Sequence, residues 1–122
     1  MAHYVDGFLI PIPKKNVEAY KRLAKKASVV WKDHGALEYR ECVGDDLSHK
    51  GAKFTFPRAA KSKSGETVIF SWIVYKSRAH RDSVNKKVMK DPRLAEMMVP
   101  GAPMPFDFKR MAYGGFKVIV EF

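Results

Sequence analysis

The chain has 122 residues, which suffices for one domain with a hydrophobic core and leaves no room for a second. Hydrophobic residues make up 46% and charged residues 30%, as in an ordinary soluble globular protein, and the single cysteine excludes an internal disulfide and a multi-cysteine zinc site. The formal net charge of +10 is spread along the chain without one basic block, which favours a lysine-rich solvated surface over a nucleic-acid-binding one.

The hydropathy of the chain gives no sign of a membrane or of secretion. No apolar run approaches the roughly 20 residues that cross a bilayer. The beginning of the chain lacks a basic segment ahead of an apolar stretch, which a secretory signal would need. We therefore expect a cytoplasmic protein.

A first strand is predicted over residues 3–12, ended by Pro11 and Pro13, which cannot donate to a sheet. Gly7, in the middle of this strand, is expected to make room for Trp72 on a neighbouring strand. One face of the predicted strand carries Tyr4, Asp6, Phe8 and Ile10.

The next elements are a helix and a second strand. Apolar residues recur every three or four positions over residues 16–34, which predicts an amphipathic helix. Asn16 is the expected N-cap, and Gly35 is expected just beyond the end in a left-handed conformation. Residues 36–43 are predicted to form the second strand.

The third strand is the centre of the predicted fold. It follows a long exposed excursion over residues 45–65, with one turn of helix expected near Pro57. Residues 68–75 are apolar in both alternating sets, which predicts a central strand buried on both faces. Ser77 is then the expected N-cap of a helix over residues 78–91.

The chain is predicted to end on a fourth strand. A short helical turn over residues 93–98 and a proline-stiffened loop over residues 99–106 precede it. The strand itself spans residues 109–122, with Gly114 and Gly115 indicating a bulge or bend.

The order of these elements, β-α-β-β-α-β, predicts a single α+β domain over residues 1–122 with the ferredoxin-like arrangement and a four-stranded antiparallel sheet. Two helices cover only one face of such a sheet. The other face is expected to be too apolar for water, so a second copy should cover it and form a dimeric α/β barrel. The residues assigned to that face are Tyr4, Phe8, Ile73 and Tyr75.

Four stretches resemble the YbaA-like family of small bacterial proteins: YVDGFLIPIPK, WKDHGALEYREC, ETVIFSWIVYKSRAHRDSVNKKVMKDPRL and MPFDFKRMAYGGF. The family is a domain of unknown function that resembles the dimeric α/β-barrel superfamily, so the resemblance implies this fold and a homodimer. The superfamily includes cofactor-free monooxygenases, small isomerases and haem enzymes. The family has no established catalytic residues, so the resemblance implies no particular activity.

Asp6 is the leading catalytic candidate, because a buried carboxylate must be paired, hydrogen-bonded or raised in pKa, and each state suits an acid or a base. The alternative is a structural salt bridge to a residue such as Arg40. Arg40 shares a face with Glu38 and Cys42, which we expect to face the cavity between subunits, and it is expected to meet Asp6 across Ser71. The predicted ligand-binding residues are Tyr4, Phe8, Glu38, Ser71, Ile73 and Tyr75.

Other reactive residues favour structural roles. Cys42 has no histidine tied to it by sequence, so a small buried thiol is favoured over a nucleophile. His80 lies on the same helical stripe as Val84 and Val88, which favours a satisfied, partly buried side chain. The histidines have no metal-ligand spacing, and no glycine-rich loop opens a helix, so neither a metal nor a cofactor is predicted.

The leading functional interpretation is a homodimeric small-molecule-binding barrel. Its chemistry would be cofactor-free proton transfer or oxygenation of a small aromatic or carbonyl compound, with Asp6 and Arg40 as its catalytic residues. The alternatives are a basic nucleic-acid-binding module of the same fold and a structural or regulatory dimer with a closed cavity. The sequence does not decide whether the protein is an enzyme.

Overall fold

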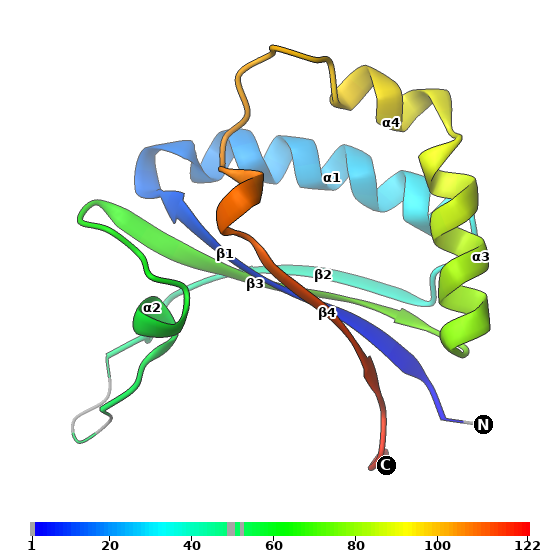
Figure 1. The fold of residues 1–122 in the computed structure, drawn as a ribbon, viewed down its shortest axis with the longest axis horizontal. Helices are drawn as coiled ribbons and strands as arrows, with labels where there is room; N and C mark the ends of the chain where they lie inside the picture. Colours follow the sequence, from blue (N-terminus) through cyan, green and yellow to red (C-terminus); the bar gives the residue numbers. More distant parts are fainter. Residues whose placement is uncertain (1, 49–50, 52) are drawn as a thin grey trace.

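The computed structural model describes residues 2–48, 51 and 53–122, and its elements follow the predicted order (Figure 1). The strands are β1 (Tyr4–Pro13), β2 (Glu38–Val43), β3 (Glu66–Tyr75) and β4 (Ala112–Lys117). The helices are α1 (Val17–Asp33), α2 (Phe56–Ala59), α3 (Arg78–Met89) and α4 (Pro92–Met97). The strands pair antiparallel in the order β2-β3-β1-β4, which confirms the predicted ferredoxin-like sheet.

The helix boundaries follow the predicted signals with one exception. Ser77 caps α3, since its hydroxyl accepts a hydrogen bond from the backbone N–H of His80 at 3.1 Å. Gly35 follows α1 with a φ of 110°, as predicted for a residue free of a Cβ clash. Asn16 lies at the N-cap position of α1, but its side chain makes no capping bond. Its amide donates instead to the backbone oxygen of Pro105 at 3.0 Å.

The excursion between β2 and β3 contains the predicted turn of helix, α2, which includes Pro57. Residues 49, 50 and 52 of this excursion lie outside the described part of the chain. Within the described part, no helix is long and apolar enough to cross a membrane.

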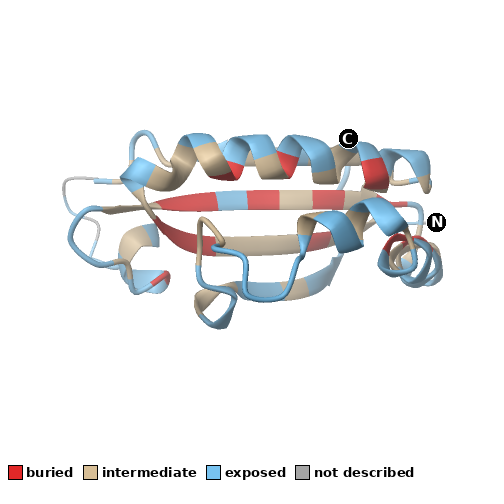
Figure 2. Ribbon diagram, turned by 90° about the horizontal axis from the view of Figure 1, so that it is seen from above, coloured by how far each residue is buried: buried red, intermediate tan, exposed pale blue. Residues whose placement is uncertain are grey.

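One face of the sheet is covered by α1, α3 and α4, and the other carries no helix except the short α2 beside its edge (Figure 1). Buried residues are concentrated along the central strands and the inner side of α1 (Figure 2). Two clusters form the core beneath the helices. They contain Ile10, Ile12 and Tyr20 at one end, and Ile73, Tyr75 and Val88 at the other.

The helices cover the face that was predicted to be open. Asp6 and Ile73 are cross-strand neighbours, and Ile73 and Tyr75 pack against α3 with only 4% and 0% of their surface exposed. The assignment of Tyr4, Phe8, Ile73 and Tyr75 to a dimer face is therefore wrong. Both alternating sets of these strands are apolar, so the alternation identifies the two sets without saying which of them the helices cover.

The prediction that β3 is buried on both faces holds for the covered face, and on the other face only for Val68 near the start of the strand. On the open face, Phe70 is 45% exposed, and Trp72 and Val74 are half-buried. We call this uncovered side of the sheet the open face.

The glycines of the sheet accommodate aromatic rings. A Cβ at Gly7 would lie 3.3 Å from the ring of Phe116, so Phe116 and not Trp72 uses this space. At Gly115 a Cβ would lie 2.8 Å from Cε2 of Tyr4, so the Tyr4 ring would have to shift to admit a side chain. The expected bulge is absent, because β4 keeps one continuous register with β1 over its whole length.

Candidate functional site

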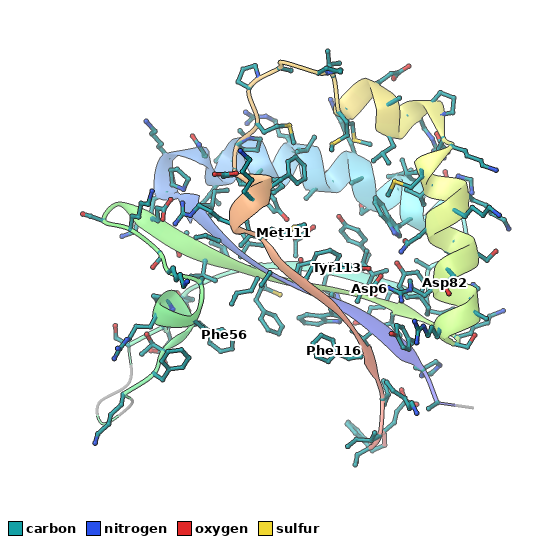
Figure 3. The ribbon with its side chains drawn as sticks, in the orientation of Figure 1. Asp6, Phe56, Asp82, Met111, Tyr113 and Phe116 are labelled. Atoms are coloured by element: carbon teal, nitrogen blue, oxygen red, sulfur yellow. The ribbon has the colours of Figure 1, made fainter. Side chains whose placement is uncertain are left out.

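A cavity of about 410 Å³ lies between the covered face of the sheet and the helices α1, α3 and α4. The segment that leads into β4 closes another side, and Figure 3 shows Met111, Tyr113 and Asp6 on this side of the sheet. The walls are mostly apolar. Five of the six methionines of the chain line the cavity: Met89, Met97, Met98, Met104 and Met111.

Asp6 forms the first polar group in the cavity wall, and it is only 1% exposed. Its Oδ1 accepts a hydrogen bond from Nη1 of Arg81 at 2.9 Å, and Nδ2 of Asn85 lies 3.5 Å from its Oδ2. Nη1 of Arg81 also donates to the hydroxyl of Tyr113 at 2.8 Å. The Arg81 guanidinium lies 5.0 Å from the ring centre of Tyr4. Nε of Arg81 also donates to Oδ1 of Asp82 at 2.8 Å, so Arg81 is held by two carboxylates, a hydroxyl and an aromatic face.

Asn85 ties this group to two further elements. Its Oδ1 accepts hydrogen bonds from Nε1 of Trp31 in α1 at 3.1 Å and from the hydroxyl of Tyr75 in β3 at 3.2 Å. Asn85 lies one helical turn after Arg81 in α3, so both side chains reach the same carboxylate.

The electrostatics of this group suit proton transfer. Burial raises the pKa of Asp6 above its ordinary value, and the positive charge of Arg81 and hydrogen bonds from Asn85, Tyr113 and Tyr75 oppose part of this rise. Burial also raises the pKa of the Tyr75 hydroxyl, and the negative charge of Asp6 adds to that rise. At neutral pH the tyrosine is therefore a donor, and Asp6 is a stronger base than an exposed aspartate.

Glu41 forms a second polar group on the covered face. The hydroxyl of Tyr20 donates to its Oε1 at 2.7 Å, and the hydroxyl of Tyr39 donates to its Oε2 at 2.8 Å. Burial, followed by the charge of Glu41, raises the pKa of both tyrosines, so both keep their protons. Ser71 lies directly across from Glu41 on β3 and hydrogen-bonds Tyr20.

Several of the predicted site residues meet in this cavity, within one chain and not between two sheets. The residues that line it are Asp6, Phe8, Ser71, Ile73 and Tyr75. Tyr4 does not line the cavity, but its ring lies against Arg81.

The predicted contact between Asp6 and Arg40 is wrong. Arg40 borders the cavity, but its side chain is 63% exposed and its Nε donates to Oε1 of Glu38 at 2.8 Å. In the register, Arg40 lies opposite Trp72 and Asp6 lies opposite Ile73, so the two side chains project from opposite faces of the sheet. Glu38 and Arg40 are on the open face, as predicted, but that face is not the cavity.

A pattern in the sequence could have identified Arg81 as the partner of Asp6. Arg81, Val84, Asn85 and Val88 are spaced by three and four residues, so they form one stripe of α3. Val84 and Val88 are almost completely buried. The apolar members of the stripe indicate that its polar members also face the sheet.

The two remaining candidate residues, Cys42 and His80, lie outside the two polar groups of the cavity. Cys42 was expected to be buried, but it is exposed on the open face beside Phe70. His80 is half-buried, as predicted, and its Nδ1 accepts a hydrogen bond from the backbone N–H of Lys76 at 2.9 Å. Burial and the neighbouring lysines lower the pKa of His80. Among the described residues, no group of three or more potential ligands could hold a metal ion.

The open face carries an apolar groove of its own, about 730 Å³ in volume. Phe56 and Phe116 lie on this side of the sheet in Figure 3. The ring centres of Phe56 and Phe70 are 5.7 Å apart, as are those of Phe70 and Trp72. Exposed aromatic rings on a sheet face of this kind point to an interaction surface.

Comparison with known proteins places the chain among relatives of unknown function. Residues 3–108 match the model of the family described as protein of unknown function DUF1428. The chain is 44% identical over 118 residues to the uncharacterized protein YbaA of Escherichia coli K12, covering 97% of each chain, and equally similar to YbaA of Shigella flexneri. The predicted resemblance to the YbaA-like family is confirmed.

Solved structures with the same fold share little sequence with the chain. A dimeric ferredoxin-like protein from an uncultured marine organism superposes with a TM-score of 0.59 at 11% identity, covering 100% of both chains. A Nipsnap family protein of unknown function from Agrobacterium tumefaciens gives 0.58 at 14% identity, covering 96% of this chain and 88% of that one. These similarities show the fold.

Proposed function

We propose, given that the chain belongs to the DUF1428 family of proteins of unknown function, that it binds a small molecule in the cavity between its sheet and its helices. The observation that carries this proposal is the buried carboxylate of Asp6 in the wall of a largely apolar cavity of about 410 Å³. Sites for small molecules typically have volumes of about 300–1,000 Å³, apolar walls and a few fixed polar groups.

The chemistry that Asp6 supports best is proton transfer to or from the bound molecule. Its raised pKa brings the carboxylate closer to the range of a useful general base. Arg81 takes the place that was expected for Arg40, since it orients the carboxylate from α3. A small aromatic or carbonyl compound with an acidic C–H or O–H bond fits both the apolar walls and this base.

Native mass spectrometry of the freshly purified protein tests the binding proposal, and we expect a retained small molecule. The methionine methyl groups that line the cavity report binding by NMR during a broad ligand screen. Ala27→Phe fills the cavity from α1 and should abolish binding, whereas Ala95→Phe on the exposed side of α4 should not. A protein that retains nothing, and whose methionine signals respond to no compound, does not have this function.

The catalytic part of the proposal has a separate test. Wild-type protein should exchange a carbon-bound acidic proton of its bound compound with deuterated water, since O–H protons exchange without a catalyst. Asp6→Asn, which keeps the shape of the side chain and removes the base, should slow this exchange by at least about 100-fold. Equal exchange rates would make the protein a binding protein only.

We also propose that two copies associate through their open faces. The supporting observation is the groove over β1, β3 and β4, with Phe70 45% and Phe116 61% exposed. Beyond β4 the chain ends in an apolar segment in which Ile119 and Val120 are 88% and 86% exposed. A second copy would remove both surfaces from water.

One observation favours nucleic-acid binding as the second candidate function. RNA-recognition modules of this strand order stack bases on aromatic residues of an exposed sheet face, and Phe70 and Trp72 lie on such a face here. Binding of this kind should be insensitive to sequence and should weaken steeply with salt. Titration of a labelled single-stranded nucleic acid at two salt concentrations tests this candidate function. A dimer that buries the rings of Phe70 and Trp72 would not bind the nucleic acid.

A further inference from the structure

The cavity wall contains a second carboxylate, Glu41, whose charged neighbours differ from those of Asp6. The charged residues that border the cavity are Asp6, Glu41 and Arg40, and the guanidinium of Arg40 is paired with Glu38 on the open face. The charge of Asp6 is balanced by Arg81 at 2.9 Å. Among the described residues, no cationic side chain forms an ion pair with Glu41. The half-buried Glu41 therefore brings to the cavity wall a carboxylate without an ion-pair partner among the described residues, in a protein whose net charge is +10.

The Glu41 carboxylate accepts both of the hydrogen bonds that its tyrosine neighbours make with it. Tyr20 and Tyr39 each have a single hydroxyl proton, and both protons point at the carboxylate. Burial and the charge of Glu41 raise the pKa of both hydroxyls, so neither tyrosine becomes an anion near neutral pH. This group offers carboxylate lone pairs to a ligand, and a ligand must donate to bind there.

The walls beside Glu41 are aromatic. The rings of Tyr20 and Phe106 are 5.5 Å apart and meet edge to face, and those of Trp31 and Tyr39 are 6.2 Å apart. Aromatic faces attract a cation, and most strongly where water is excluded. A carboxylate between aromatic walls is a favourable surrounding for an ammonium group with an apolar body.

We propose that Glu41, with Tyr20 and Tyr39, forms a recognition site for a protonated amine carried on an apolar, aromatic or aliphatic body. This inference rests on the proposed small-molecule function of the cavity and names its ligand class. The ammonium group donates to Glu41 and supplies the missing positive charge. The apolar body lies along the methionine-lined wall. Anionic compounds are repelled from the same site.

Three probes of matched shape test the inference: phenethylamine, phenethyl alcohol and phenylacetate. Each is titrated at neutral pH into wild-type protein with isotope-labelled methionine methyl groups. We expect phenethylamine to shift the cavity methionines at lower concentration than the alcohol, and phenylacetate to shift them least. Glu41→Gln should weaken amine binding by at least about tenfold and change alcohol binding by less than about threefold.

Glu96→Gln is the matched control, because it removes the same charge from an exposed position on α4 and should leave all three affinities unchanged. Phenylacetate binding as tightly as the amine, or an amine affinity that survives Glu41→Gln, would overturn the inference while leaving the binding function in place. No response to any of the three probes would also overturn it, and the broad screen then judges the binding function separately. If Glu41→Gln does not fold, the ranking of the three probes on wild-type protein decides.

Discussion

Asp6 of β1 and Arg81 of α3 form an ion pair with 2.9 Å between Oδ1 and Nη1, although 75 positions separate them in the chain. Their side chains are 1% and 14% exposed. The pair joins the first strand to the second long helix, and its carboxylate lines the cavity. It therefore links the stability of the fold to the electrostatics of the proposed site.

Arg81→Met should destabilise the protein by about 3–5 kcal/mol at pH 7, because the buried Asp6 loses its counter-charge. Without the guanidinium the pKa of Asp6 rises further above 3.8, so the native state holds its proton more tightly than the unfolded state. The difference in unfolding free energy between wild type and Arg81→Met should therefore grow as the pH rises through the pKa of Asp6. It should shrink as the pH falls toward 3.8. Urea unfolding of both proteins across this pH range measures this difference.

Arg40→Met is the control for this measurement. Arg40 pairs with Glu38 on the open face and is 63% exposed, so its loss should cost less than about 1 kcal/mol at any pH. Equal losses for the two variants would show that the Asp6–Arg81 pair contributes no more than a surface pair.

Glu66→Gln should destabilise the protein at neutral pH by about 2 kcal/mol. Arg110 donates to both carboxylate oxygens of Glu66, at 2.7 and 2.8 Å, and these hydrogen bonds hold the pKa of Glu66 at about 2. Because this pKa is below the ordinary 4.5, the stabilisation is complete above pH 4.5 and is lost as the pH falls toward 2. The difference between wild type and variant should vanish over that interval in acid unfolding experiments, and a constant difference would contradict it.

Phe70→Lys should convert the proposed dimer into a monomer. Phe70 lies in the middle of the open face, and a lysine there would be buried without a partner in the association of two sheets. Val29→Lys, at a position of α1 that is 49% exposed, should leave the dimer intact. Sedimentation at micromolar concentration separates the outcomes, and a monomeric wild-type protein would contradict the proposed association.

The elements of the fold were predictable because local signals specify them. Ser77 and Gly35 mark the beginning and the end of helices by backbone chemistry that needs no knowledge of the rest of the chain. The pairing order follows from the sequence of strands and helices, since few arrangements bury both helices on one sheet.

The site was only partly predictable because it depends on which face of the sheet the helices cover. Asp6, Ser71 and Tyr75 were grouped correctly, since alternation along paired strands places them on one face. The alternation is unchanged when the two faces are exchanged, so Arg40 was assigned as the partner of Asp6 in place of Arg81. A charged residue on a lysine-rich helix such as α3 also resembles a solvated one until its neighbours on the same stripe are considered.

The glycines that face each other across β1 and β4 have a consequence for the kinetics of binding. Gly7 and Gly114 are cross-strand neighbours without side chains, so the middle of this edge pairing is covered only by the ring of Phe116. The segment that leads into β4 also walls the cavity through Phe106 and Met111. Detachment of this edge strand would be a local opening that exposes the cavity. Ligand entry would then occur at the rate of that opening, and amide hydrogen exchange in β4 should be fast in the empty protein and slow in the loaded one.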